Sequence, residues 1–251
     1  MSSIEMSAIT FVLVFGGALL GLFIRRRLPE HHQNADTKDV VRLGMGLVGT
    51  IVAIALGLLI GSAYSYFNNQ TDELVHASAD VAALGRLLRH YGPEANGVHE
   101  ALRMAVEQVS ENMWPQQQAE KSKFSPEAAP LEVVYEQLRS LIPKDDEHRM
   151  MKSEALSLLK SLALMRWLVL EQTSTTVLRP LVFVLIFGLT AIFVSWGLFS
   201  PLNATSGTTF FVAALCVSGA ILLILELYSP YSGLLRVSSA PLHLAYESLE
   251  Q

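Results

Sequence analysis

The chain has 251 residues, of which 51% are apolar and only 16% are charged. A typical soluble protein has about 25% charged residues, so this composition excludes a soluble enzyme and favours a protein embedded in the lipid bilayer. The net charge of −5 argues against a nucleic-acid partner, because phosphate backbones are bound by basic surfaces.

Uncharged segments in the first part of the chain predict two membrane-spanning helices. Residues 6–24 and 43–67 contain no charged side chain. Each segment is long enough to cross the hydrocarbon core, which takes about 20 apolar residues in a helix. A basic cluster, residues 25–27, follows the first segment, whereas a cleavable signal peptide carries its positive charge before the apolar run. We therefore expect two permanent spans joined by a short polar loop, residues 25–42.

A third uncharged segment, residues 180–225, is long enough for two further spans. Pro201 and Gly207 interrupt it, and both residue types favour a break between helices. The segment therefore predicts a hairpin of two spans near residues 180–199 and 208–227.

The region between the second and third spans has the apolar spacing of amphipathic helices. Apolar side chains recur three or four residues apart in four stretches, which are separated near Pro93, Pro115 and Pro143. Residues 115–130 contain several prolines and indicate a loop. Acidic residues at 145–147 suit the N-terminal end of the last of these helices. We predict an antiparallel helical bundle whose first and last helices are continuous with the second and third spans.

The predicted fold class is an all-α integral membrane protein with four transmembrane helices. A soluble helical-bundle domain is inserted between the second and third. The predicted divisions are residues 1–67 for the first transmembrane pair with its short polar loop, 68–179 for the soluble helical domain, 180–228 for the second transmembrane hairpin, and 229–251 for a C-terminal tail.

Two sequence blocks resemble the bestrophin-like family of bacterial membrane proteins. The first runs from Leu28 to Ala63 and reads LPEHHQNADTKDVVRLGMGLVGTIVAIALGLLIGSA. The second follows the last span as SPYSGLLRVSSAPL, and its motif residues are Pro230, Gly233, Ser238 and Pro241. The order of the spans and the middle domain is similar as well, so the resemblance covers nearly the whole chain.

The resemblance implies a four-helix membrane unit similar to that of bestrophin anion channels. Those channels are ring-shaped oligomers around a pore made by the second helix, which implies self-association here and inorganic ions as partners. The family commonly has an acidic residue two positions before the proline of the second block. This sequence has Tyr228 there and Glu226 two residues earlier. Because Glu226 ends the fourth span, it needs a polar neighbour or interfacial water.

Small residues line one face of the second span, namely Gly46, Thr50, Ala53, Gly57 and Gly61. Small side chains let helix backbones approach closely, so this face suits tight helix packing. The same face also suits a narrow pore. The span has no charged residue, so any selectivity filter would use backbone groups, the hydroxyl of Thr50 or an apolar constriction. Both interpretations place the face inside the protein, away from lipid.

Asp72, His76 and Asp80 lie at positions i, i+4 and i+8, on one side of a helix just beyond the second span. Their oxygen and nitrogen atoms are candidate ligands for a divalent metal, particularly if several copies surround an axis. His31 and His32 in the first loop are further candidates. A solvated helix surface and a loop at the lipid headgroups explain the same residues, and no cofactor is predicted.

No catalytic motif is present, since the chain lacks GxSxG, Walker, HExxH and CxxC patterns. We therefore expect no enzyme activity. We interpret the chain as a homo-oligomeric ion channel with a pore lined by the second span. The alternative is a non-conducting membrane scaffold or sensor whose helical domain binds a partner.

Loop charges predict an orientation in the bacterial inner membrane. Basic residues outnumber acidic ones in loop 25–42, whereas residues 68–85 contain no Lys or Arg. Short loops rich in Lys and Arg stay in the cytoplasm, so loop 25–42 is expected to be cytoplasmic. Both termini and the middle domain would then face outward. The bestrophin resemblance implies the opposite, with the inserted domain in the cytosol.

Overall fold

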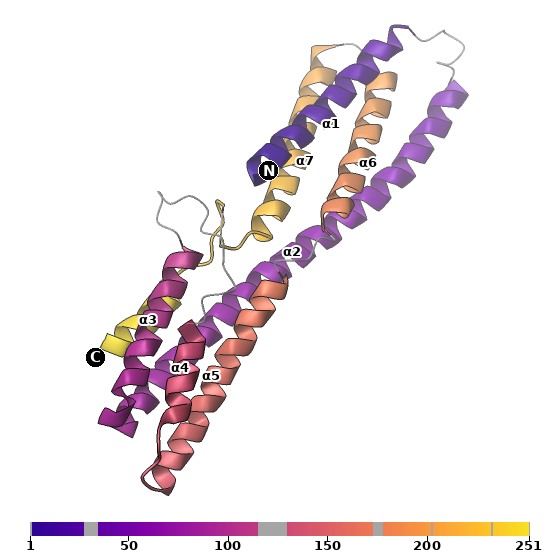
Figure 1. The fold of residues 1–251 in the computed structure, drawn as a ribbon. Coiled ribbons are helices and arrows are strands. Elements are labelled where there is room, and N and C mark those ends of the chain that lie inside the picture. The colour runs from indigo at the N-terminus through magenta and orange to yellow at the C-terminus, as the bar shows by residue number, and fades with distance from the viewer. Residues whose placement is uncertain are drawn as a thin grey trace. The chain divides into compact units, whose positions relative to one another are not determined.

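The computed structural model describes residues 2–27, 35–114, 130–172, 178–201, 203–231 and 233–250. Within these ranges the chain is helical and contains no strand, which confirms the all-α prediction. The helices are α1 (Ser3–Arg25), α2 (Ala35–Tyr91), the short 3-10 helix η2 (Pro93–Ala95), α3 (Asn96–Met113), α4 (Pro130–Ser140), α5 (Asp146–Gln172), α6 (Leu178–Phe199), α7 (Ala204–Leu227) and α8 (Ala240–Glu250) (Figure 1).

Among the described residues, α1, α2, α6 and α7 are each long and apolar enough to cross a membrane. The predicted polar loop 25–42 is longer than the structure allows, because α2 already begins at Ala35. Its first turns are polar yet helical, with Arg42 and Asp39 forming an exposed i,i+3 ion pair at 3.7 Å. Two predictions concern residues outside the described ranges: the loop around residues 115–129, and the continuity of the last soluble helix into the third span through residues 173–177.

The chain forms two compact units. Unit 1 consists of Met1–Phe67, Thr175–Ser229 and Gly233–Leu235, and unit 2 of Asn68–Ser174, Pro230–Ser232 and Arg236–Gln251.

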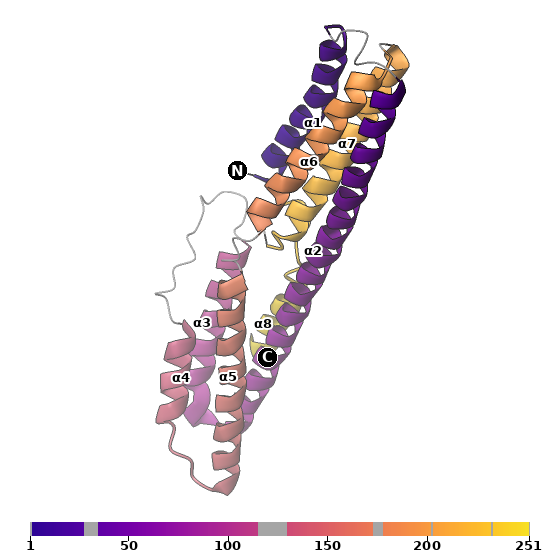
Figure 2. The same ribbon diagram turned by 90° about the vertical axis from the view of Figure 1, so that its right-hand side faces the viewer.

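In unit 1, α1 packs against α6 and α7, and the three helices run side by side (Figures 1 and 2). Close approach between α1 and α6 depends on glycine. A Cβ at Gly21 would overlap the backbone of α6 near Val194, and one at Gly197 would overlap the backbone at Ala18. The spacing of small residues in the first span therefore serves backbone contact within the chain. Large apolar side chains, including Val14, Phe193 and Ile221, fill the core around this contact.

Local signals fix the ends of the unit 1 helices. Ser2 and Glu5 form a capping box at the start of α1, with hydrogen bonds of 3.2 and 2.9 Å. The side chain of Asn203 accepts a hydrogen bond from the Ser206 amide at 2.9 Å and so caps α7. Arg25, in the last turn of α1, donates to the carbonyl of Ser200 in the connection between α6 and α7. This bond ties the end of the first span to the turn of the hairpin.

In unit 2, α3, α4, α5 and α8 gather around the last part of α2 (Figure 2). The predicted stripes supply its core: Leu84, Leu88, Leu102, Leu138 and Leu162 are all buried. The corner after α2 forms as expected, with Gly92 at φ 105° and Pro93 opening η2.

Helix α8 was not predicted. It lies within the predicted C-terminal tail, residues 229–251, and its Leu242, Ala245 and Leu249 pack into the unit 2 core. Gly85 provides the space for this packing, because a Cβ there would overlap the side chain of Leu249.

Candidate functional site

The small-residue face of α2 is not covered by any described residue outside its own helix. Gly46, Thr50, Ala53, Gly57 and Gly61 are all exposed. A Cβ placed on any of these three glycines would meet no heavy atom within 4 Å beyond its own helix. The hydroxyl of Thr50 donates to the carbonyl of Gly46 at 3.0 Å. Packing between copies, lining of a pore and contact with lipid are therefore the roles open to this face.

A second exposed stripe, missed by sequence reasoning, lies beside the first. It consists of large apolar residues three or four apart on α2: Leu47, Ile51, Ile54 and Leu58, each 59–71% exposed. Burial in lipid, between copies or around a pore would remove this surface from water. The spacing of these residues is visible in the sequence. Because the whole span is apolar, however, the sequence does not show which of its large residues are buried and which are exposed.

The opposite face of α2 packs on its own unit. Leu59 and Ala63 are buried in the unit 1 core, and Tyr66 stacks on Tyr228 with ring centroids 5.2 Å apart. The hydroxyl of Tyr228 also lies 2.9 Å from that of Ser62. Tyr228, two positions before Pro230, thus holds the end of α7 against α2.

The second sequence block forms a turn that encloses a carboxylate. Glu226 is only 4% exposed, and its side chain accepts hydrogen bonds from the backbone amides of Leu234 at 2.5 Å and Leu235 at 3.3 Å. Gly233 makes this approach possible, because its φ is 108° and any Cβ there would overlap the carboxylate. The sequence predicted a polar neighbour or interfacial water for Glu226, and in the structure two backbone amides donate to its carboxylate.

The other motif residues of this block build the connection to α8 in unit 2. The carbonyl of Pro230 accepts a hydrogen bond from the amide of Val237 at 2.8 Å. Ser238 accepts from the amide of Ala240 at 3.2 Å, and Pro241 occupies the first turn of α8. Trp114 donates its indole N–H to the carbonyl of Val237 at 3.0 Å. These residues therefore act in folding the tail.

The candidate metal ligands do not form a site within one chain. Asp72 and His76 are exposed on α2, and Asp80 is half-buried. Across the described part of the chain, no group of three His, Cys, Asp or Glu side chains is placed to hold a metal ion. The hypothesis that several copies combine these residues around an axis stays a prediction. His31 and His32 lie outside the described residues.

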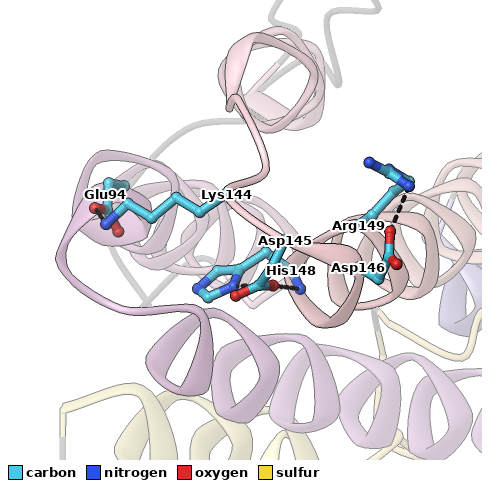
Figure 3. A network of polar contacts seen from close by, with 6 residues as sticks. All are labelled: Glu94, Lys144, Asp145, Asp146, His148 and Arg149. Carbon is cyan, nitrogen blue, oxygen red and sulfur yellow. Dashed lines mark hydrogen bonds and ion pairs between the residues drawn. The ribbon is translucent and has the colours of Figure 1, made fainter.

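A polar network joins the start of α5 to the corner after α2 in unit 2 (Figure 3). Asp145 accepts from the backbone amide of His148 at 2.8 Å and lies 2.6 Å from its Nδ1 atom. The hydrogen bond to Asp145 raises the pKa of His148. Lys144 pairs with Glu94, and this contact lowers the pKa of the Glu94 carboxyl. Sequence reasoning identified the acidic helix start but missed its histidine partner, which lies one helical turn further on.

The Bestrophin-like domain matches residues 12–242 of the sequence. This chain belongs to the bestrophin-like family. The resemblance drawn from the two sequence blocks is thereby confirmed. Family membership and the four long apolar helices together identify a membrane protein.

Solved structures with the same fold include crystal structures of a bacterial bestrophin homologue from Klebsiella pneumoniae, each with one substitution. One has a TM-score of 0.69 at 13% identity and covers 96% of both chains. A second has a TM-score of 0.67 at 15% identity and covers 97% of both chains. A third has a TM-score of 0.66 at 15% identity and covers 99% of this chain and 97% of the other. No curated protein matches the sequence significantly.

Proposed function

We propose that this chain forms a homo-oligomeric ion channel whose pore is lined by α2. The observation that carries the proposal is the exposed small-residue face of α2, which lies in an apolar span and contacts no described residue of its own unit beyond its helix. Membership of the bestrophin-like family supports the proposal, as does a fold shared with a bacterial bestrophin homologue over nearly the whole chain.

A ring of α2 helices with this face inward would enclose a narrow path without charged groups. Small side chains leave open space at the axis, and Thr50 supplies a side-chain hydroxyl midway along the face. The Thr50 proton is directed to the Gly46 carbonyl, so its oxygen is left to contact water or a cation. Apolar constrictions gate by dewetting and select ions weakly. We therefore expect modest selectivity and a steep dependence of conduction on side-chain size.

The proposal includes a topology. The four apolar helices cross the bacterial inner membrane, the helical part of unit 2 lies outside the bilayer, and loop 25–42 is cytoplasmic by the charge rule. The proposal assigns the chain no catalytic chemistry and no cofactor.

A non-conducting scaffold or sensor is the second candidate. It needs an apolar docking surface on the helical domain, and unit 2 has an open groove of about 260 Å³ between α2 and α8. Val75, Ala79 and Leu244 line this groove and are exposed, with Leu244 66% accessible. A partner helix covering the groove would bury these residues.

Ion flux into liposomes separates the two functions. Wild type, Thr50→Leu and Thr50→Asp would be reconstituted at matched density after each is verified as an intact oligomer. A channel predicts protein-dependent flux that Thr50→Leu abolishes and Thr50→Asp shifts toward cations, because a ring of carboxylates attracts them. An intact oligomer without flux, across several ions, pH values and divalent concentrations, would favour the scaffold.

A further inference from the structure

An apolar groove opens on unit 1 between the start of α2 and the second half of α6. Its volume is about 440 Å³. Its main lining residues are Val41, Met45, Phe187, Ala191, Val194 and Leu198. Thr190 and Ser195 also line it, and the hydroxyl of Thr190 donates to the carbonyl of Ile186 at 2.8 Å. The groove therefore offers an occupant mainly hydrophobic contact along its length.

The groove exists because α2 and α6 touch at one level and separate beyond it. A Cβ placed on Gly188 would lie 3.1 Å from the Cγ2 atom of Val52, so the helices are in close contact there. Val41 and Met45 lie further toward the start of α2, on the same helical face as Val52. The space between the helices is thus a wedge that narrows to van der Waals contact. A thin, flexible chain fits such a wedge better than a protein helix about 10 Å across.

The length of the groove matches one leaflet of a bilayer. Its α6 lining extends from Phe187 to Phe199, which at 1.5 Å per residue is roughly 18 Å. Half of the hydrocarbon core is roughly 15 Å. Both walls belong to helices that are apolar enough to span the membrane, so the groove lies at acyl-chain depth.

The open end of the groove is basic. Lys38 lies one turn before Val41 on the same face of α2 and is half-buried, as Val41 is. Arg42 follows and is exposed, with the exposed carboxylate of Asp39 3.7 Å away. At the α6 end, Arg25 donates to the carbonyl of Ser200, so a further cation lies at the same level of unit 1.

We propose that this groove binds an anionic phospholipid. One acyl chain lies between α2 and α6, and the headgroup phosphate contacts Lys38 and Arg42. The inference rests on the membrane insertion included in the proposed function but not on ion conduction. Basic groups at the end of an apolar slot between membrane helices suit a negatively charged headgroup.

Native mass spectrometry of the full-length protein in detergent tests the headgroup contact. The protein would be titrated separately with phosphatidylglycerol and phosphatidylcholine carrying the same acyl chains. Wild type should bind phosphatidylglycerol more tightly. Lys38→Gln and Arg42→Gln should each weaken that binding about fivefold and leave phosphatidylcholine unchanged. Lys160→Gln, an exposed lysine of unit 2, is the matched control and should have no effect. Equal affinity of wild type for both lipids would overturn the proposal.

A substitution that fills the groove with a larger side chain tests the acyl-chain contact. Ala191→Phe should abolish tight binding of both lipids, because the ring occupies the wedge. Val184→Phe on the exposed side of α6, outside the groove, should bind as wild type does. Equal lipid binding by the two variants would contradict the inference. Loss of oligomer mass in Ala191→Phe with lipid binding intact would show that a second copy occupies the groove instead.

The lipid-binding experiments do not measure ion flux, so the lipid site and the channel are tested independently. A protein that conducts ions but shows no lipid preference would overturn only the lipid site. A protein that binds phosphatidylglycerol in the groove but conducts nothing would overturn only the channel.

Discussion

Gly233 leaves the space that the carboxylate of Glu226 fills. The glycine adopts a φ of 108°, and the two amides after it donate to the carboxylate, so a charged group at the end of α7 is enclosed by backbone donors. The geometry explains why a glycine stands at this point of the second sequence block.

Gly233→Ala should therefore destabilise the protein by about 1–3 kcal/mol, through backbone strain and displacement of the carboxylate. Thermal unfolding in detergent measures the effect, and limited proteolysis should show earlier cleavage of the C-terminal segment. Gly219→Ala in α7 is the matched control, because a Cβ there meets no atom within 4 Å. Equal stability of the two variants would show that the enclosure of Glu226 is not important for folding.

Gly57→Leu should lower the oligomer population without unfolding the chain. A Cβ at Gly57 meets no described atom within 4 Å outside its own helix, so the added side chain should not disturb the fold of the chain and should act on contacts between copies. Mass measurement in mild detergent, together with the thermal unfolding of the same samples, separates assembly from folding. A wild-type monomer, or a variant that keeps the oligomeric mass of the wild type, would remove this role for the α2 face.

The contact between His148 and Asp145 should make stability depend on pH. Asp145 raises the pKa of His148, so the folded state holds the proton more tightly than the unfolded chain does. The stabilisation is complete below the unfolded pKa of about 6.5 and is lost as the pH rises through the higher folded value. Tyr91, Lys144 and Glu94 are the other titratable groups facing this site.

Thermal unfolding of wild type and His148→Gln at pH 6 and pH 9 measures this linkage. The destabilisation caused by the substitution should be larger at pH 6. In an Asp145→Asn background the pH dependence of the difference should disappear, because the partner that raises the pKa is gone. A difference independent of pH in the native background would contradict the linkage.

The orientation prediction follows from the basic residues of loop 25–42. A reporter active only in the cytosol, fused after Gln251, should be inactive, whereas one active only outside the cytosol should report activity. Exchange of the basic residues at 25–27 for glutamine should weaken the preference. The reverse pattern of reporter activity would place the helical domain in the cytosol instead.

Helical spacing predicted much of the fold because amphipathicity is a local property. Leu84, Leu102 and Leu138 were placed on apolar stripes from their sequence neighbours alone, and each is buried. The same signal was present in α8, where Leu242, Ala245 and Leu249 recur three and four residues apart.

Features that depend on distant segments were not predictable in this way. The acceptor role of Glu226 depends on the backbone angle of Gly233, and the groove depends on where α2 separates from α6. The sequence identified the small-residue face of α2 as a candidate site. Only the structure showed that no described residue outside the helix covers this face, whereas Gly21 and Gly197 pack on helices far away in the sequence.

Cysteine accessibility combined with ion flux tests the pore most directly. In a Cys216→Ser background, Ala53→Cys and Ile54→Cys would be treated with a charged, water-soluble thiol reagent in liposomes, with Val184→Cys on α6 as the lipid-facing control. A pore lined by the small-residue face predicts that modification of Ala53→Cys stops most of the flux, while Val184→Cys conducts as before. Block at Ile54→Cys with Ala53→Cys unaffected would assign the pore to the large apolar stripe. Flux that is insensitive at both α2 positions would contradict a pore lined by α2.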